Sequence, residues 1–284
     1  MRNAASAWAD ARDPDLSGRA DAGKTMDVAV VIPALNEAAT IRDVASRALR
    51  QVARVIVVDD GSRDGTASTL HGLPVQILRN PHTLGKAASL RRGMAAALQE
   101  GASAVITLDG DGQHAPEDIP RLIAASQQNS GVIVVGARLH DSHEIPRARY
   151  LANRFANFWI AWAAGYPLQD SQSGFRLYPA ALLRTLDVEH SLSRGFVFES
   201  EILIDAARAG VKSVAVAIPA VYSTKARRSH FRPVIDILLI TRMVAWKLLS
   251  RGLYVSGLIR SLQRSDGMSY RYENSEVTNS VERS

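Results

Sequence analysis

The chain has 284 residues, of which 46% are hydrophobic and 22% charged, the composition of a folded globular protein. This length can bury a sizeable core in one large domain or two small ones. The absence of cysteine excludes disulfides and thiolate metal sites, and it agrees with a reducing compartment. The polar first 25 residues lack the apolar core of a signal peptide, and no run of 18 apolar residues predicts a membrane-spanning helix.

From Asp27 onward, apolar strands alternate with helices. Strands are predicted at 28–32, 55–58, 75–78, 104–108 and 132–135, and helices at 36–50, from 64, and at 85–98. This regular alternation predicts an α/β fold with a mainly parallel, mixed sheet that helices cover on both faces.

The pattern changes after residue 138. The sequence predicts an aromatic-rich helix at 147–164, a polar loop at 170–176, a helix within 195–210 and a short strand at 214–218. The expected organisation is a disordered tail at 1–25, one α/β domain at 26–222, a basic amphipathic segment at 223–264 and a disordered tail at 265–284.

Positive charge is concentrated in that basic segment. The net charge is +6, and residues 222–264 hold nine Lys and Arg against a single acid, Asp236. Long aliphatic runs separate these cations, which favours an anionic membrane surface over nucleic acid as partner. A strongly apolar helix is predicted at 233–249, with Asp236, Lys247 and Arg251 in one sector. Two interpretations stay open: the helix docks on the protein core, or it lies in a membrane interface with its cations among lipid headgroups.

One motif near the N-terminus is rejected. Residues 18–25 match the phosphate-loop pattern GxxxxGK[ST]. The mechanism of that motif needs a strand before the loop and a helix after it. Here a polar segment precedes the match and a strand follows it, so the context is reversed.

Polar clusters follow four of the predicted strands, at 33–37, 59–62, 109–113 and Arg138. The carboxyl ends of parallel strands meet at one edge of a sheet, where ligands bind. Asp109 and Asp111, set among glycines, suit a hard divalent cation whose other ligands are diphosphate oxygens. An isolated DGDG could also be a solvated turn, but the convergence of four clusters favours a site.

These clusters resemble the motifs of a known family. VIPALNE at 31–37, VVDDGS at 57–62, Gly85-Lys86 and DGDGQH at 109–114 are similar, in kind and order, to those of family 2 glycosyltransferases with a GT-A fold. Within that family the chain looks most like the dolichyl- or polyprenyl-phosphate mannose synthase group. The resemblance covers about residues 27–220. It implies an inverting, metal-dependent transfer of a sugar from a nucleotide-diphosphate sugar.

The resemblance also implies roles for individual residues. Asp109 and Asp111 match the DXD metal motif and Gln113 a further ligand, for Mg²⁺ or Mn²⁺, and Arg138 would reach the diphosphate or sugar. Leu35 stands where the family commonly has an aromatic residue. The residues expected to bind the nucleotide sugar are Pro33, Leu35, Asn36, Glu37, Val58, Asp60, Gly61, Lys86 and Gly110.

The acceptor is expected to be a polyprenyl phosphate or another membrane lipid, reached from the cytosolic face. The loop at 170–176 resembles the corresponding loop of lipid-phosphate enzymes. A phosphate acceptor is ionised at neutral pH and needs no base to activate it. Arg227 and its neighbours could close over the site, or form a solvated basic loop. The residues expected to bind the acceptor or a phosphate are Asp170, Ser173, Arg176, Arg228, His230 and Arg232.

Alternative functions are weighed on the same residues. A sugar hydroxyl as acceptor would need a carboxylate base, for which Glu199 and Glu201 are the candidates. A non-catalytic nucleotide-binding, membrane-associated protein could keep the fold, although the intact Asp109/Asp111 pair argues against it. A nucleotidyltransferase or a dinucleotide-dependent oxidoreductase would need a glycine-rich loop after the first strand, and PALNEAAT contains no glycine.

Overall fold

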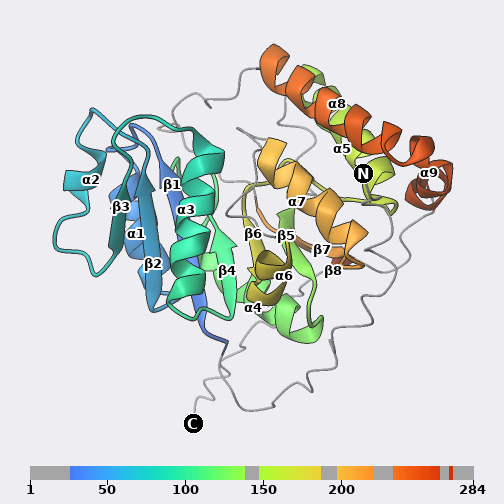
Figure 1. Ribbon diagram of the computed structural model, residues 1–284. Coiled ribbons are helices and arrows are strands. Elements are labelled where there is room, and N and C mark those ends of the chain that lie inside the picture. The colour runs from blue at the N-terminus through green and yellow to red at the C-terminus, as the bar shows by residue number, and fades with distance from the viewer. Residues whose placement is uncertain (1–25, 138–146, 187–196, 220–232, 263–268, 271–284) are drawn as a thin grey trace, which may run out of the picture.

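The computed structural model describes residues 26–137, 147–186, 197–219, 233–262 and 269–270 (Figure 1). Its centre is an eight-stranded sheet in the order β3-β2-β1-β4-β6-β5-β7-β8. The strands are β1 Val28–Ala34, β2 Arg54–Asp59, β3 Gln76–Arg79, β4 Ala104–Thr107, β5 Ile133–Ala137, β6 Arg176–Pro179, β7 Ser213–Ala217 and β8 Ser269–Tyr270. Only β6 runs antiparallel to its neighbours, β4 and β5, so within the described residues the predicted mainly parallel, mixed sheet is confirmed.

Helices cover both faces of this sheet, as predicted (Figure 1). The α-helices are α1 Ile41–Leu49, α2 Thr66–Thr69, α3 Lys86–Gln99, α4 Ile119–Gln128, α5 Arg147–Ala164, α6 Ala180–Thr185, α7 Val197–Arg208, α8 Pro233–Leu249 and α9 Val255–Leu262. Two short 3₁₀ helices are η1 Pro116–Asp118 and η3 Gly252–Tyr254. None of the described helices is both long and apolar enough to cross a lipid bilayer.

The parallel strands end at one edge of the sheet. Ala34 of β1 lies beside Asp59 of β2, and Val31 of β1 beside Thr107 of β4. The polar clusters that follow β1, β2 and β4 are therefore brought together, as the strand pattern predicts.

One helix begins later than predicted. The sequence suggests a helix from residue 36, whereas α1 begins at Ile41. Asn36 has a positive φ of 55°, outside the right-handed helical region. The carbonyl of Glu37 accepts hydrogen bonds from the amides of Thr40 and Ile41, which closes a turn before the helix. This turn holds residues 36 and 37 at the sheet edge instead of inside a helix.

The strand β6 was not predicted, because Arg176 begins it and made the segment look like a polar loop. The strand is inserted between β4 and β5, with Arg176 beside Thr107. The Thr107 hydroxyl donates a hydrogen bond of 2.7 Å to the carbonyl of Gly174. The insertion therefore places the loop before β6 beside the end of β4.

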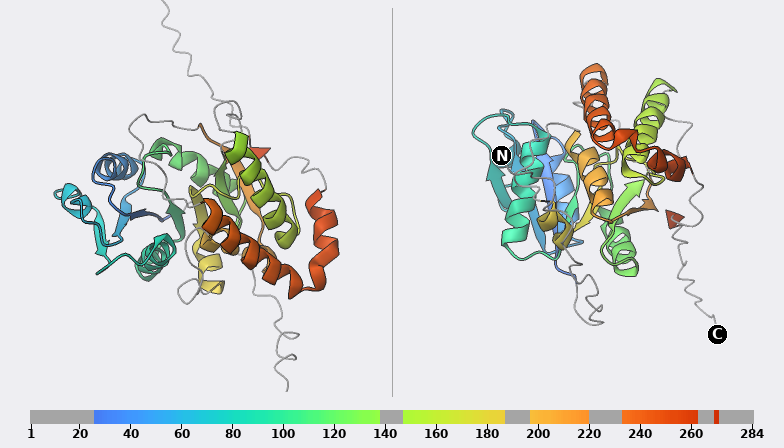
Figure 2. Two further views of the ribbon diagram at one scale, coloured as in Figure 1. Left: turned by 90° about the horizontal axis from the view of Figure 1, so that it is seen from above. Right: turned by 45° about the vertical axis from the view of Figure 1, so that its right-hand side comes forward.

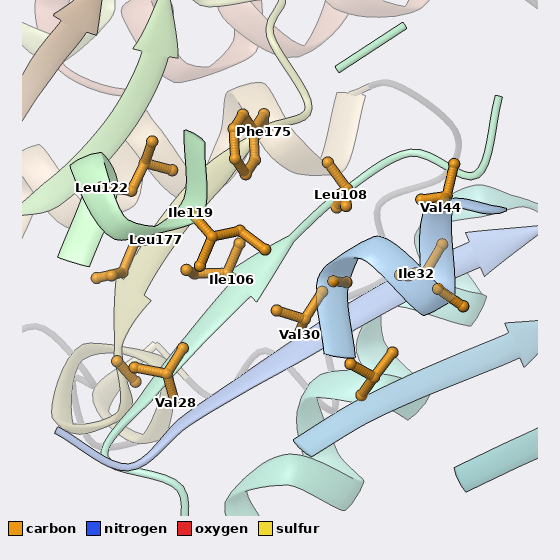
Figure 3. Close-up of a cluster of buried hydrophobic side chains, with 14 of the residues drawn as sticks. Val28, Val30, Ile32, Val44, Ile106, Leu108, Ile119, Leu122, Phe175 and Leu177 are labelled. Carbon is orange, nitrogen blue, oxygen red and sulfur yellow. The ribbon is translucent and has the colours of Figure 1, made fainter. Parts of the chain in front are cut away.

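Two hydrophobic clusters fix the sheet between its helices. On one face, side chains of β1, β4 and β6 meet those of α1 and α4, as Figure 3 shows for Ile32, Val44, Ile106, Leu122 and Leu177. The opposite face packs against α3, α6 and α7 through a second cluster of fully buried aliphatic and aromatic residues. Burial on both faces explains why the central strands β1, β4 and β5 are almost entirely apolar, whereas the edge strand β3 is polar at both ends and mostly exposed.

A third hydrophobic cluster joins α5, α7 and α8, through Ile160, Ile204, Ile240, Val244 and Leu248. The predicted helix at 233–249 is thus confirmed as α8, and it docks on the protein. Figure 2 shows α8 and α9, coloured orange to red, on the outside of the molecule. The helix α9 was not predicted.

Candidate active site

The loop after β4 carries the two aspartates of the DXD pattern. The hydroxyl of Thr40 donates a 2.7 Å hydrogen bond to the carbonyl of Gly110, which ties this loop to the start of α1. The amide of Gln113 donates to Oδ1 of Asp111 at 3.0 Å, closing a turn over the second carboxylate. Local hydrogen bonds therefore fix the loop at Gly110 and Asp111, at the carboxyl end of β4.

An ion-pair cluster surrounds Asp109. Nζ of Lys86, the first residue of α3, lies 2.7 Å from Oδ1 of Asp109 and 3.2 Å from Oε2 of Glu199, in the first turn of α7. Burial opposes the lysine charge, but the two carboxylates outweigh it and raise the pKa of Lys86 above its usual value. Lys86 therefore remains cationic and links two carboxylates from different parts of the chain.

Gly174 completes this cluster because it has no side chain. A Cβ built on Gly174 would lie 2.8 Å from Oδ2 of Asp109, 3.0 Å from Nζ of Lys86 and 3.2 Å from Oε1 of Glu199. Real Cβ atoms essentially never come as close as the 2.8 Å to Asp109, and the other two contacts are tighter than most, so a side chain here would displace at least the Asp109 carboxylate. The sequence analysis assigned no role to Gly174, since the contact depends on the unpredicted strand β6.

The loop at 170–176 is organised from inside by Arg176. Its guanidinium is fully buried and donates hydrogen bonds to the carbonyls of Ser171, Ser173 and Glu199, at 2.7, 2.7 and 2.6 Å. The expected role of Arg176 as a phosphate ligand is not supported, because backbone acceptors occupy its donors. Ser173 is buried as well, with its hydroxyl accepting from the amide of Phe175, which corrects the same expectation for Ser173. Asp170 is partly exposed at the start of this loop.

The cluster after β2 holds the segment that leads into α3. The carboxylate of Asp60 accepts hydrogen bonds from the amides of Leu84 and Gly85 at 2.9 and 2.8 Å, and from the amide side chain of Asn80 at 2.7 Å. Gly61 has a φ of +75°, and a Cβ there would meet the carbonyl carbon of His82 at 2.7 Å. Asp60 and Gly61 thereby position the entry to α3, and with it Lys86.

A pocket of about 370 Å³ opens beyond the ends of β2 and β3, lined by Gly61, Ser62, Arg63, Arg79, Asn80 and Pro81. Its two arginines were missed by the sequence analysis, because neither belongs to a recognised motif. A pocket at the carboxyl edge of a parallel sheet is where a nucleotide is expected to bind.

The cluster after β1 lies against the cluster after β2. The amide of Asn36 donates to Oγ of Ser62 at 2.9 Å, and the amide of Glu37 donates to Oγ1 of Thr66 at 2.9 Å. Pro33 and Leu35 are partly buried at the same edge. Val58 differs, because its side chain is fully buried in the cluster beneath α3, so it cannot line a pocket as expected.

The two glutamates considered as a base, Glu199 and Glu201, lie in different surroundings. Glu199 lies in the Lys86 cluster, whereas Oε1 of Glu201 is 3.0 Å from Nζ of Lys247 on α8. Residues two positions apart in a helix point in nearly opposite directions, so both glutamates could not face one site. Glu201 therefore lies with Lys247 on the α8 side of α7, away from the Lys86 cluster. Four other predicted site residues, Arg138, Arg228, His230 and Arg232, lie outside the described residues.

The fold is a mixed α/β sheet with a polar site at the carboxyl edge of its parallel strands, and the sequence comparison assigns this arrangement to a family of transferases. The family model described as glycosyl transferase family 2 matches residues 29–187. The chain belongs to this family and is a glycosyltransferase.

Relatives are similar over most of the domain. The polyprenol monophosphomannose synthase of Mycolicibacterium smegmatis is 28% identical over 206 residues, which cover 68% of this chain and 77% of that protein. The undecaprenyl-phosphate mannosyltransferase of Micrococcus luteus is 29% identical over 208 residues, covering 68% and 83%. Among solved structures, glucosyl-3-phosphoglycerate synthase from Mycobacterium tuberculosis with Mn²⁺, UDP-glucose and phosphoglyceric acid has a TM-score of 0.57 at 25% identity, covering 81% of this chain and 80% of that one. The same synthase has been crystallised with Mg²⁺ and UDP, so divalent metals occur in this group.

Proposed function

We propose that the protein transfers a sugar from a nucleotide-diphosphate sugar to a polyprenyl phosphate at a membrane surface, with inversion at the anomeric carbon. The names of two of the relatives, a polyprenol monophosphomannose synthase and an undecaprenyl-phosphate mannosyltransferase, support this acceptor class. The reaction is assigned to the cytosolic face, where nucleotide sugars are supplied.

The position of the Glu199 side chain bears on whether the acceptor is a hydroxyl or a phosphate. A hydroxyl acceptor needs a base with an accessible lone pair close to the reacting oxygen. The Glu199 side chain is only 6% exposed, with one oxygen held by Lys86 at 3.2 Å. Its other oxygen is buried against Gly174 and has no hydrogen-bond partner within the described part of the chain. Because neither Glu199 nor Glu201 is placed to accept a proton from an acceptor, an acceptor that is already ionised fits best.

The donor atoms of the DXD loop suit a divalent metal ion. Two carboxylates and a carboxamide are hard oxygen donors of the kind that Mg²⁺ and Mn²⁺ prefer, so Asp109, Asp111 and Gln113 would hold the ion. No group of three or more His, Cys, Asp or Glu side chains in the described ranges is placed to bind a metal. The protein therefore offers a partial ligand set, which diphosphate oxygens of the donor would complete. When bound, the metal supplies positive charge that stabilises the departing nucleoside diphosphate.

The chain itself orients the reactants. The amino end of α3 carries Lys86 and points at the site, so its ammonium and the helix dipole both favour a diphosphate there. An oxygen of the acceptor phosphate forms a bond to the anomeric carbon while the bond from that carbon to the donor's β-phosphate oxygen breaks. The bonding electrons leave with the nucleotide. A single displacement of this kind inverts the anomeric configuration.

The test is a transfer assay with Mn²⁺, UDP- and GDP-sugars and a polyprenyl phosphate in detergent. We expect a product that extracts into organic solvent and releases its sugar in mild acid. The Asp109→Asn and Asp111→Asn variants should lose at least about 100-fold in turnover, because both weaken charge stabilisation in the transition state. Sugar transfer to glycan or glycerate hydroxyls, without transfer to the lipid phosphate, would contradict the proposal.

A further inference from the structure

Exposed apolar side chains gather on the C-terminal helices. Eleven large apolar residues of the described chain are exposed, and seven of them lie on α8, η3 and α9. Trp246 is 72% exposed, Leu249 64% and Leu262 66%, which is unusual for residues of this size. We call six of them the apolar crest: Leu239, Trp246 and Leu249 of α8 and Val255, Ile259 and Leu262 of α9.

The crest is a coherent stripe on each helix. At about 100° per residue, the crest residues of α8 fall within an arc of about 80°, and those of α9 within about 60°. Lys247 lies about 120° from the middle of the α8 arc. Its ammonium turns inward, where it lies 2.7 Å from Oδ2 of Asp205 and 3.0 Å from Oε1 of Glu201 on α7. The helix thus buries its lysine and exposes apolar residues, which contradicts the expectation that Lys247 reaches lipid headgroups.

Positive charge dominates the sequence around the crest, and the one acid in the sequence of α8 is Asp236, three residues before Leu239. Arg242, Arg251 and Arg260 are exposed, and the sequence has no Asp or Glu from residue 237 to residue 265. The Arg251 guanidinium lies over the ring of Tyr254, 4.2 Å from its centroid. At about 100° per residue, Arg242 lies within the apolar arc of α8, whereas Arg260 lies outside the arc of α9. An apolar stripe with exposed cations in it and near it, and with a tryptophan among its residues, matches the boundary between acyl chains and anionic headgroups.

The crest is fixed to the body of the enzyme. The indole nitrogen of Trp162 on α5 donates to the carbonyl of Leu253 at 3.1 Å, which pins the link between α8 and α9. The α7 helix that pairs with Lys247 also carries Glu199 in its first turn. Figures 1 and 2 show α8 and α9 along one outer side of the molecule. A partner bound at the crest would therefore hold the active site in a defined orientation.

We propose that the apolar crest inserts into the headgroup–acyl boundary of an anionic lipid bilayer and docks the enzyme there without a spanning helix. The proposal rests on the proposed function in one respect: a lipid-phosphate acceptor places the substrate in the same bilayer. Six large apolar residues together with three exposed cations satisfy the two requirements of interfacial binding, buried apolar area and attraction to anionic lipid.

The test uses the full chain and vesicles that contain neither donor nor acceptor, so that it is independent of the transfer assay. Wild-type protein should float with phosphatidylglycerol-containing vesicles and much less with pure phosphatidylcholine vesicles. In the Trp246→Glu/Leu249→Glu variant, binding should weaken by at least about tenfold, the order expected from the loss of one buried large apolar side chain. The matched control is Ile77→Glu, at an exposed apolar residue on β3, which should bind like wild type.

A second measurement reports whether Trp246 enters the acyl region of the bilayer. Lipids brominated on the acyl chain should quench wild-type fluorescence, and the Trp246→Phe variant should lose that quenching. The double variant should still transfer sugar to geranyl phosphate, a short water-soluble acceptor, at the wild-type rate. The proposal is overturned if wild-type protein does not bind anionic vesicles, if the double variant binds them equally well, or if it instead abolishes a concentration-dependent dimer. Vesicle binding with no lipid transfer would refute the acceptor and leave the crest assignment standing.

Discussion

At Gly174, a single hydrogen in place of a side chain lets a lysine and two carboxylates meet. Gly174→Ala should lower kcat by about 10–100-fold, because sub-ångström to ångström misplacement of catalytic groups has effects of that order. Its effect on melting temperature should be small. The measurement is steady-state kinetics together with thermal unfolding.

The control for this variant is Gly101→Ala. Gly101 has a φ of +84° and nothing within 4 Å of an added Cβ. Alanine there should cost about 1 kcal/mol of stability through backbone strain and leave kcat unchanged. Equal kcat values for the two variants would show that the Gly174 contact does not matter for turnover.

Lys86 would compete with the proposed metal for Asp109. Its ammonium is 2.7 Å from Oδ1 of that aspartate, so a divalent cation must share the carboxylate with a fixed positive charge. In nucleotide-free protein, Lys86→Met should bind Mn²⁺ at least about tenfold more tightly, since unit charges a few ångströms apart interact by a few kcal/mol near a protein surface and about 1.4 kcal/mol already corresponds to tenfold. Turnover should fall, because the donor diphosphate loses a cation.

Mn²⁺ affinity can be measured by isothermal titration calorimetry, with Lys212→Met as a control far from the DXD loop in the sequence. Unchanged Mn²⁺ affinity in Lys86→Met would locate the metal away from Asp109.

At the scale of secondary structure, the buried guanidinium of Arg176, at the start of β6, stabilises the loop that carries Gly174. Arg176→Met would leave the buried carbonyls of Ser171 and Ser173 without their donor, at about 1–3 kcal/mol each, and would remove the hydrogen bond to the Glu199 carbonyl, which keeps its helical partner. We expect a loss of at least about 3 kcal/mol and a fall in melting temperature of roughly 10 °C. Circular dichroism melting measures it. A stable variant that lost only affinity for the acceptor phosphate would restore the phosphate-ligand interpretation.

Lys247 joins two helices through a largely buried ion pair. Lys247→Met should destabilise the protein by about 1–3 kcal/mol, less than a fully buried pair because both acids are partly exposed. Binding to anionic vesicles should be unchanged once the variant is folded. Arg242→Met, at an exposed cation of the same helix, should show the reverse: stability like wild type and weaker vesicle binding. Urea denaturation and vesicle flotation distinguish these results.

For the whole molecule, local pattern predicted the parallel half of the sheet and the polar clusters at its edge. Most of these strands, such as β1 and β4, are nearly continuous apolar runs, and each cluster lies within a few residues of its strand. The Lys86–Asp109–Glu199 cluster could not be assembled this way, because Glu199 reaches the site through tertiary packing. Arg176 was also misread, because a charged residue at the start of a strand made a buried segment look like a loop. For Lys247, the sequence could not show that its ammonium pairs with acids on α7, so that the lysine side of α8 faces the protein.

The strand β6 has a consequence for how the protein folds. Its pairing joins Thr107 to Arg176, so β4 keeps an open edge until nearly seventy further residues are available. Contacts between distant segments form slowly because a long loop must close first. The part of the sheet made of β1 to β4 can therefore assemble early, whereas the loop with Gly174 reaches Asp109 only when β6 pairs with β4. Until then one edge of β4 exposes unpaired backbone groups. A chaperone bound during synthesis would therefore prevent aggregation most effectively at this strand.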